Sequence, residues 1–127
     1  MHIPPFDNAN SPIVDTNDSM TPLVYFNRVL LNAGDTFESH VAGYETCIVP
    51  ATGSVDIQIE DFSATGVGER GSDVWDGEPS GVYAPVGARV QIKATTKTEV
   101  FIAGAKFDEV YKPFAIRQNN IDLVQYG

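Results

Sequence analysis

The sequence contains few cysteines and histidines and lacks long apolar runs, the features that would indicate a disulfide-bonded, metal-binding or membrane-spanning protein. It contains one cysteine and two histidines, and no apolar run approaches the roughly 20 residues that a membrane-spanning helix needs. A single cysteine cannot form a disulfide within the chain, so Cys47, in the apolar run TCIVP, is expected to be a small core residue in a reducing environment. The N-terminus has neither the basic nor the apolar region of a secretory signal. We therefore expect a cytoplasmic protein that does not bind membranes.

Positive charge is also scarce. Eight lysine and arginine residues stand against 17 aspartate and glutamate residues, which gives a formal net charge of -9. A phosphate backbone requires a basic face, and the basic residues here are scattered singly, so nucleic acid is not an expected partner. A small anionic ligand is still compatible with this charge, because one or two arginines can bind a carboxylate locally.

Helical periodicity is absent as well, and short β-type runs take its place. In residues 54–60 the apolar Val55, Ile57 and Ile59 alternate with polar residues, which is the period of a half-buried strand. Further runs of this kind cover 23–31, 36–41, 44–50, 73–75, 81–85, 89–95 and 99–107. Turn-bounded strands about every ten residues predict an all-β sandwich or barrel, and specifically a jelly roll that leaves few exposed edges.

The two ends of the chain are expected to differ from this body. Residues 1–22 are polar and interrupted by proline, which predicts a loose N-terminal arm, and residues 23–110 would form the barrel. Residues 111–127 form a C-terminal extension that contains apolar side chains such as Phe114 and Ile116. Exposing such side chains to water costs about 25 cal/mol per Å², so the extension should pack on its own barrel, on a second domain or on another copy.

The stretch from Gly34 to Gly53 has the outline of a metal site that lacks part of its ligand set. His40 follows Gly34 by six residues, and Ala42 stands where a second histidine would complete a His-x-His pair. Residues two apart on a strand point to the same side, which is why that spacing brings two imidazoles together. Only His40 and Glu45 would remain as ligands, whereas a transition metal needs three or four. We expect no metal in this chain, with a His40/Glu45 centre as the alternative.

The order of these residues resembles a known superfamily. The segment GDTFESHVAGYETCIVPATG, followed by PVGARV (Pro85 to Val90), resembles the two-part motif of the cupins. The blocks YETCIVPATGSVDI, GERGSDVWDGEPSGVYAPVGARVQIKA and EVFIAGA, in this order, resemble the N-terminal half of the 5-deoxyglucuronate isomerase family of myo-inositol catabolism. The similarity runs from about Leu23 to the end, and its most specific part extends from Arg70 to Pro85.

This resemblance implies a single cupin-type jelly-roll barrel (a double-stranded β-helix) that forms one half of a two-cupin protein. The implied reaction is the aldose–ketose isomerisation of a deoxy sugar acid. The divalent metal is implied to belong to the histidine-rich second half, so no cofactor is expected here, and Val90 stands where the second cupin motif has a histidine. The end of the chain would be the start of a linker to that missing half. The expected partners are therefore the second cupin half or another copy of the chain, with a small anionic sugar as a ligand.

Four side chains are candidates for catalysis or binding. Glu45 could act as a base, Arg70 and Arg89 could bind a sugar-acid carboxylate through two hydrogen bonds, and Tyr83 could stack on a sugar ring. The structural alternatives are a salt bridge at the rim for each arginine and a core position for Tyr83 and Trp75. Because no oxyanion stabiliser accompanies Glu45, the isolated chain is expected to be inactive.

Two other functions stay open on the sequence alone. One is a free-standing, metal-free cupin that binds a small sugar acid or a partner protein. The other is a single-cupin isomerase or epimerase that works without metal through Glu45 or a tyrosine. A reading frame that continues past Gly127 into a histidine-rich half would favour the two-cupin isomerase over both.

Overall fold

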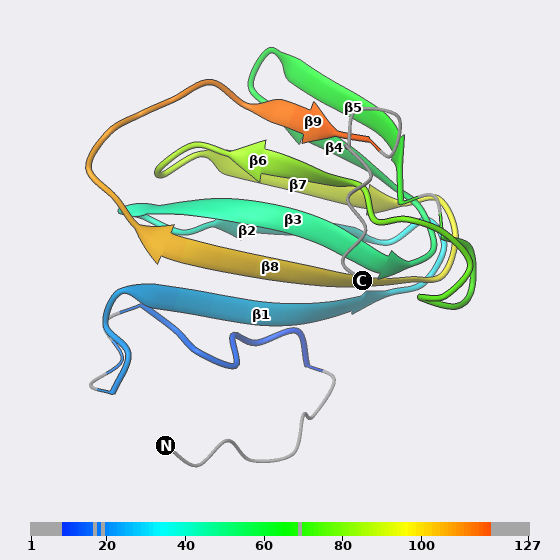
Figure 1. The fold of residues 1–127 in the computed structure, drawn as a ribbon, viewed down its shortest axis with the longest axis horizontal. Coiled ribbons are helices and arrows are strands. Elements are labelled where there is room, and N and C mark those ends of the chain that lie inside the picture. The colour runs from blue at the N-terminus through cyan, green and yellow to red at the C-terminus, as the bar shows by residue number, and fades with distance from the viewer. Residues whose placement is uncertain (1–8, 17, 19, 69, 118–127) are drawn as a thin grey trace, which may run out of the picture.

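The computed structural model describes residues 9–16, 18, 20–68 and 70–117, and within them the fold is all-β (Figure 1). The strands are β1 (Val24–Leu31), β2 (Thr36–His40), β3 (Tyr44–Thr52), β4 (Val55–Ile59), β5 (Phe62–Val67), β6 (Gly81–Ala84), β7 (Arg89–Ala94), β8 (Thr98–Lys106) and β9 (Phe114–Ile116). The described residues contain no helix that is long and apolar enough to cross a membrane.

Two antiparallel sheets pack face to face. The five-stranded sheet has the order β1-β8-β3-β6-β9, and the four-stranded sheet has the order β2-β7-β4-β5. No two neighbours in the five-stranded sheet are consecutive in the chain, which is the crossing pattern of a jelly roll. In Figure 1 this sheet runs from β1 at the lower edge to β9 at the upper edge, with the other sheet behind it. The predicted fold class is confirmed.

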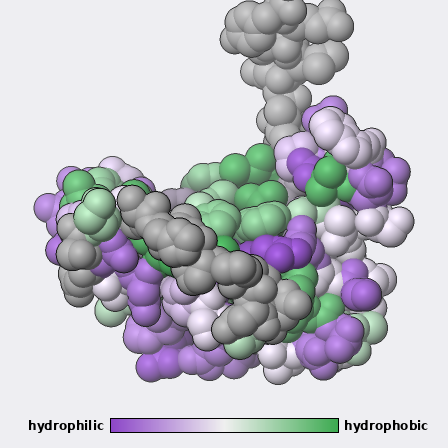
Figure 2. Space-filling model, turned by 90° about the horizontal axis from the view of Figure 1, so that it is seen from below, coloured by the Kyte–Doolittle hydropathy of each residue, from purple (hydrophilic) through white to green (hydrophobic). Residues whose placement is uncertain are grey.

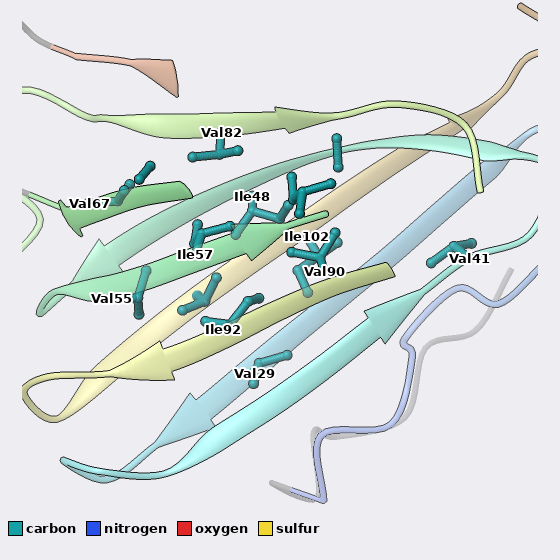
Figure 3. Close-up of a cluster of buried hydrophobic side chains, with 14 of the residues drawn as sticks. Val29, Val41, Ile48, Val55, Ile57, Val67, Val82, Val90, Ile92 and Ile102 are labelled. Atoms are coloured by element: carbon teal, nitrogen blue, oxygen red, sulfur yellow. The ribbon is translucent and has the colours of Figure 1, made fainter. Parts of the chain in front are cut away.

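The core lies between the sheets because each strand alternates between buried and exposed side chains. On β4, Val55, Ile57 and Ile59 are buried while Gln58 is exposed, as the sequence pattern predicts. Aliphatic side chains from both sheets meet in the middle and fill the space between them (Figure 3). The largest fully buried apolar side chains are Ile48, Ile57, Ile59, Ile92, Ile102, Val29, Val55, Val67, Val82, Val90 and Val100. Burying one such side chain contributes about 1.5–3 kcal/mol, so the filled barrel is the main source of stability.

The predicted strands are present with two additions and one error. Strands β5 and β9 were not predicted, because β5 contains a glycine and several polar residues, and β9 is only three residues long. A register shift between Val55 and Ile57 marks an irregularity in the β4–β5 pairing, which breaks the alternation that sequence reading relies on. All the other predicted runs except 73–75 coincide with strands to within about two residues.

The predicted strand at 73–75 is wrong, and with it the core position expected for Trp75. This segment is a turn in which Asp73 Oδ1 accepts a hydrogen bond from the Trp75 backbone N–H at 2.9 Å. The carbonyl of Asp73 also accepts from the Asp76 N–H at 3.0 Å. Local bonds of this type compete with strand pairing, and the Trp75 side chain is left 90% exposed.

The described part of the expected N-terminal arm is attached to the edge of the barrel. Residues 13 and 14 pair with the backbone of Phe26, through N–H···O bonds of 2.8 to 3.0 Å. The Asn10 side chain accepts from the Leu30 N–H at 2.8 Å and donates to the Leu30 carbonyl at 3.1 Å, as a neighbouring strand would. The buried Asn27 side chain donates to the Asn10 carbonyl at 3.2 Å. The arm therefore satisfies an edge of β1 that would otherwise be open.

The C-terminal part of the described chain joins the two sheets. Strand β9 pairs with β6 in the five-stranded sheet. One residue later, the Arg117 guanidinium donates to the carbonyls of Thr65 and Gly66 at 2.7 and 3.0 Å. These two residues belong to β5, the edge of the other sheet, so Arg117 bridges the two edges. The rest of the expected C-terminal extension, 118–127, lies outside the described residues.

Cys47 lies on the outer face of β3 and not in the core. It is half-buried, between the inward-facing Thr46 and Ile48. Burial raises the pKa of the Cys47 thiol above its usual value, so the thiol stays protonated and weakly nucleophilic. The expectation of a core position is corrected, while a role as a nucleophile gains no support.

Candidate functional site

The two parts of the cupin-like motif meet at one end of the barrel. The turn between β2 and β3, residues 41–43, and the turn between β6 and β7, residues 85–88, lie next to each other at that end. The Gly87 N–H donates to the Tyr44 carbonyl at 3.2 Å, and the Phe107 N–H donates to the Gly43 carbonyl at the same distance. This end is where a cupin-type site would be built, so its inward-facing residues decide what it can bind.

The register between β2 and β7 determines which motif residues face inward. Ser39 lies opposite Val90, and His40 lies opposite Arg89. Ser39 and Val90 are 4% and 1% exposed and point into the barrel, whereas His40 is exposed. His40 therefore lies on the outer face, because neighbouring residues of a strand point to opposite faces, and the alternative of a His40/Glu45 centre gains no support from this register.

The same reversal holds on β3 for the candidate carboxylate. Thr46 is buried and faces inward, while Glu45 points outward from the five-stranded sheet. Ser39, Thr46 and Val90 thus place two hydroxyls and an aliphatic group inward at this end, beside the buried Val41, Tyr44 and Ala84. Transition metals prefer imidazole, thiolate and carboxylate ligands, so this set does not fit the divalent metal that the cupin fold implies. Among the described residues, no group of three His, Cys, Asp or Glu side chains is placed to hold a metal ion.

A groove of about 640 Å³ opens beside these turns. It is formed by the β4–β5 turn (59–62), the β6–β7 turn (85–88) and the connection after β8 (110–113). Its polar groups include Glu60, Asp61 and Lys112, and the Tyr111 hydroxyl at its rim donates to Glu109 at 2.8 Å. Hydrogen-bonding groups of this kind suit a polyol ligand. A second hollow, of about 580 Å³, lies on the polar outer face of the four-stranded sheet and is lined in part by Thr36, Phe37 and Glu38 of β2.

Two of the predicted site residues are brought together, on the outer face of the five-stranded sheet. The Tyr83 hydroxyl donates to Glu45 Oε2 at 2.6 Å, and the Tyr83 ring stacks on Phe114 with centroids 5.0 Å apart. Partial burial, followed by the hydrogen bond to Glu45 and the charge of that carboxylate, raises the pKa of Tyr83 to about 12. Tyr83 is therefore a neutral hydrogen-bond donor at physiological pH and not a base, and Glu45 already has a partner.

The two arginines lie apart from this pair and from each other. Arg89 points outward from β7 and forms an exposed ion pair with Glu38, with Nη1 and Oε1 2.7 Å apart. Arg70 lies in the connection between β5 and β6, next to Gly71, whose carbonyl accepts from the Gly53 N–H at 2.6 Å. Gly53 follows the end of β3 that is distant from the 41–43 turn, so Arg70 is at the opposite end of the barrel. Its Nε atom is buried and has no hydrogen-bond partner among the described residues.

Comparison with known proteins identifies the family. The sequence model of the KduI/IolB family matches residues 2–127, which is almost the whole chain. The chain belongs to the KduI/IolB family. The resemblance to 5-deoxyglucuronate isomerases is thereby confirmed at the level of the family. Among curated proteins, none matches the sequence significantly.

Solved structures of this fold agree with the family. An IolB-like protein from Salmonella typhimurium superposes with a TM-score of 0.76 at 21% identity, over 83% of this chain. This KduI/IolB chain spans only 40% of that protein's length. The cupin domain of Cnp3 from Schizosaccharomyces pombe (TM-score 0.52, 14% identity) covers 77% of this chain and 64% of its own. A cupin domain of a transcriptional regulator from Enterobacter cloacae (TM-score 0.53, 16% identity) covers 78% and 95%. At these identities the similarity shows the cupin fold.

Sequence reasoning did not single out Ser39 and Thr46, and it named Phe114 only as an apolar residue of the C-terminal extension, without a strand or a partner for it. The first could have been found from the run TFESHV, where Phe37, Ser39 and Val41 continue the inward alternation and His40 does not. The strand position of Phe114 could not have been found from the sequence, because β9 is recognisable as a strand only through its pairing with β6.

Proposed function

We propose that this chain is the N-terminal, metal-free cupin half of a 5-deoxyglucuronate isomerase of inositol catabolism. In this role it supports a second, metal-bearing half or shapes the pocket for the sugar acid. The observation that carries the proposal is the inward set Ser39, Thr46 and Val90 at the motif end of a KduI/IolB-family barrel. A cupin without metal ligands is best explained as the partner of one that has them.

The length of the matched relative supports the same interpretation. This chain superposes on only 40% of the length of the IolB-like protein. The remaining length of that protein is enough for a further domain of similar size. The free-standing binding module remains the second candidate. The observation that favours it is the groove formed by residues 59–62, 85–88 and 110–113, because this groove can bind a hydroxylated ligand without a metal.

The chemistry of the reaction explains why this half alone should be inactive. An aldose–ketose isomerisation moves a proton between adjacent carbons through an enediol, so it requires a base and a group that stabilises the developing oxyanion. Glu45 is the candidate base, but it points to the outer face of the sheet, where it accepts a hydrogen bond from the Tyr83 hydroxyl. Arg70 and Arg89 remain the candidates for holding a carboxylate, and they lie on different parts of the surface. Base, anchor and oxyanion stabiliser therefore do not converge in this half.

The test compares the isolated 127-residue chain with the full-length protein encoded by its natural reading frame. Each is assayed for isomerisation of 5-deoxyglucuronate, with and without a chelator. We expect turnover only by the full-length protein, with loss of activity in the chelator. Turnover by the isolated chain that survives the chelator would assign the chemistry to this half. A reading frame that stops at Gly127, combined with binding of a sugar acid in calorimetry, would favour the binding module.

A further inference from the structure

The outer face of the five-stranded sheet carries a continuous apolar row. Phe26, Ala103, Cys47, Tyr83 and Phe114 occupy directly paired positions on β1, β8, β3, β6 and β9. All five side chains point away from the core, because each alternates along its strand with more buried neighbours on the inner face. The row therefore crosses the full width of the sheet on the side that faces away from the barrel.

The outer face of the other sheet has the opposite character. The corresponding row there, Glu38, Gln91, Gln58 and Ser63, runs across β2, β7, β4 and β5 and is polar at every position. A sheet with one solvated face is expected to carry polar residues on that face. The four-stranded sheet follows this rule, whereas the five-stranded sheet does not.

Aromatic side chains enlarge the apolar face at both of its ends. Phe26 stacks on Phe101 with centroids 5.7 Å apart, and Tyr83 stacks on Phe114 at 5.0 Å. Phe114 is 49% exposed, and Val24 beside the other stack is 46% exposed. Viewed from the β1 side, the surface shows a band of hydrophobic residues between more hydrophilic ends (Figure 2). Contiguous apolar patches of this kind mark interaction sites.

Two of the charged side chains on this face form an ion pair within the chain. The Arg28 guanidinium is paired with the Glu99 carboxylate across β1 and β8, with Nε and Oε2 2.7 Å apart. Glu45, at the start of β3, keeps its negative charge and accepts a hydrogen bond from the neutral Tyr83 hydroxyl. A partner that covers the apolar row therefore does not have to supply an opposite charge for Arg28 or Glu99.

We propose that this face binds a second copy of the chain in a two-fold symmetric dimer, with the symmetry axis parallel to β3 and midway between the two copies. Strand β3 is central in the five-stranded order, so a rotation about an axis parallel to it sets the Phe26 side of one copy against the Phe114 side of the other. The face is thus self-complementary, with aromatic groups meeting aromatic groups and the small Ala103 and Cys47 near the middle. This inference concerns the surface of the barrel and does not depend on the isomerase reaction.

The size of the face agrees with a weak dimer. Five strands spaced at about 4.8 Å, over about six residues each, give an area on the order of 500 Å² per copy. Two copies would bury on the order of 1,000 Å² in total, which is the lower limit for a specific interface. We expect a dissociation constant on the order of 10–100 μM. Because each copy carries a net charge of -9, salt should screen the repulsion and tighten the dimer.

The experiment is sedimentation velocity of the 127-residue chain from about 1 to 300 μM, at low and high salt. We expect a shift from monomer to dimer with concentration, and a stronger shift at high salt. Ala103→Glu places a charge near the middle of the face and should leave a monomer at every concentration. Gln91→Glu is the matched control, because Gln91 is exposed on the polar outer face of the other sheet. Phe114→Ser gives a second test at an exposed position, and circular dichroism verifies that each variant is folded.

Labelling of the single cysteine gives an independent measurement. Cys47 lies within the proposed interface, so its reaction with a thiol reagent should slow as the protein concentration rises, and this slowing should vanish in Ala103→Glu. A wild-type chain that stays monomeric at 300 μM would overturn the proposal. If that monomer dimerised only after removal of residues 118–127, the face would be assigned to the chain's own C-terminal segment. A dimer lost in Gln91→Glu and kept in Ala103→Glu, or one weakened by salt, would also contradict it.

Discussion

Ser39 of β2 lies directly opposite Val90 of β7, and both side chains point into the barrel. This pairing puts a hydroxyl and an isopropyl group at the motif end, while His40 is exposed on the other side of its strand. Among the described residues, this register turns the His40 imidazole and the Glu45 carboxylate away from the inside of the motif end.

We predict that the purified chain carries no stoichiometric zinc, manganese, iron or nickel. The reason is the inward set Ser39, Thr46 and Val90, none of which is a usual transition-metal ligand. Elemental analysis of the wild-type chain and of His40→Ala should give the same metal content, well below one ion per chain. About one ion per chain, lost in His40→Ala, would restore the His40 centre.

Tyr83→Phe should flatten the loss of stability at alkaline pH. An unfolded tyrosine loses its proton near pH 10, whereas folded Tyr83 keeps it to about 12, so its contribution is complete below pH 10 and is lost as the pH rises through 12. Denaturant unfolding between pH 8 and 12 measures this effect. Tyr25 and Tyr111 also have raised pKa values, so the variant should reduce the alkaline loss and not abolish it.

The control for Tyr83 is Glu45→Gln. This change keeps a hydrogen-bond acceptor but removes the negative charge that helps to raise the pKa of Tyr83. Ultraviolet titration should then show Tyr83 ionising at lower pH, together with a smaller change at Tyr111, whose pKa the charge of Glu45 also raises. An unchanged titration in Glu45→Gln would show that Glu45 does not control Tyr83.

Asn10→Ala should loosen the edge of β1. The variant loses two hydrogen bonds to Leu30, so we expect a destabilisation of about 1–2 kcal/mol. Hydrogen exchange at the Leu30 amide should accelerate, because that N–H donates to Asn10 Oδ1. Asn32→Ala, at an exposed position after β1, should leave the Leu30 amide protected. Equal exchange in both variants would mean that Asn10 does not protect the edge.

Gly53→Ala should destabilise the barrel strongly. Gly53 has a φ of +77°, and a Cβ there would lie 2.3 Å from the Lys97 carbonyl oxygen. Gly34 has a similar φ of +88° but open space around it. Gly34→Ala should therefore cost only the backbone strain, about 1 kcal/mol, and Gly53→Ala should cost at least twice as much in denaturant unfolding. Similar costs would show that the β3–β4 turn can shift to accept a side chain.

The barrel could be predicted from the sequence because its strands follow a simple rule. Val55, Ile57 and Ile59 alternate with polar residues over a full strand, and the same pattern recurs on β7. The burial of one face imposes this period, so the order of the amino acids alone reveals it. The predicted core position of Trp75 was wrong because Asp73 forms local hydrogen bonds that make the segment a turn. The neighbouring apolar residues Val74 and Trp75 give no sign of these hydrogen bonds in the sequence.

The candidate site could be predicted only in part, for a different reason. Near the end of β2, Ser39, His40 and Val41 allow two registers, and the motif spacing alone does not decide which side chains face inward. The pairing of Glu45 with Tyr83 joins β3 to β6, which are separated by two other strands in the chain. No local pattern reports such a contact, because the topology of the whole sheet creates it.

The pairing of Val24 with Ala105 determines the order in which the molecule can be assembled during synthesis. Strand β1 leaves the ribosome early, but its partner β8 follows about 80 residues later. Until then the segment LVYFNRVLL has no permanent partner in the sheet and exposes a β-prone, apolar surface. A pause in translation between residues 60 and 95 should therefore prolong the state in which β1 lacks its partner strand and depends on chaperones. This holds even though the strands made by then have their native sequence.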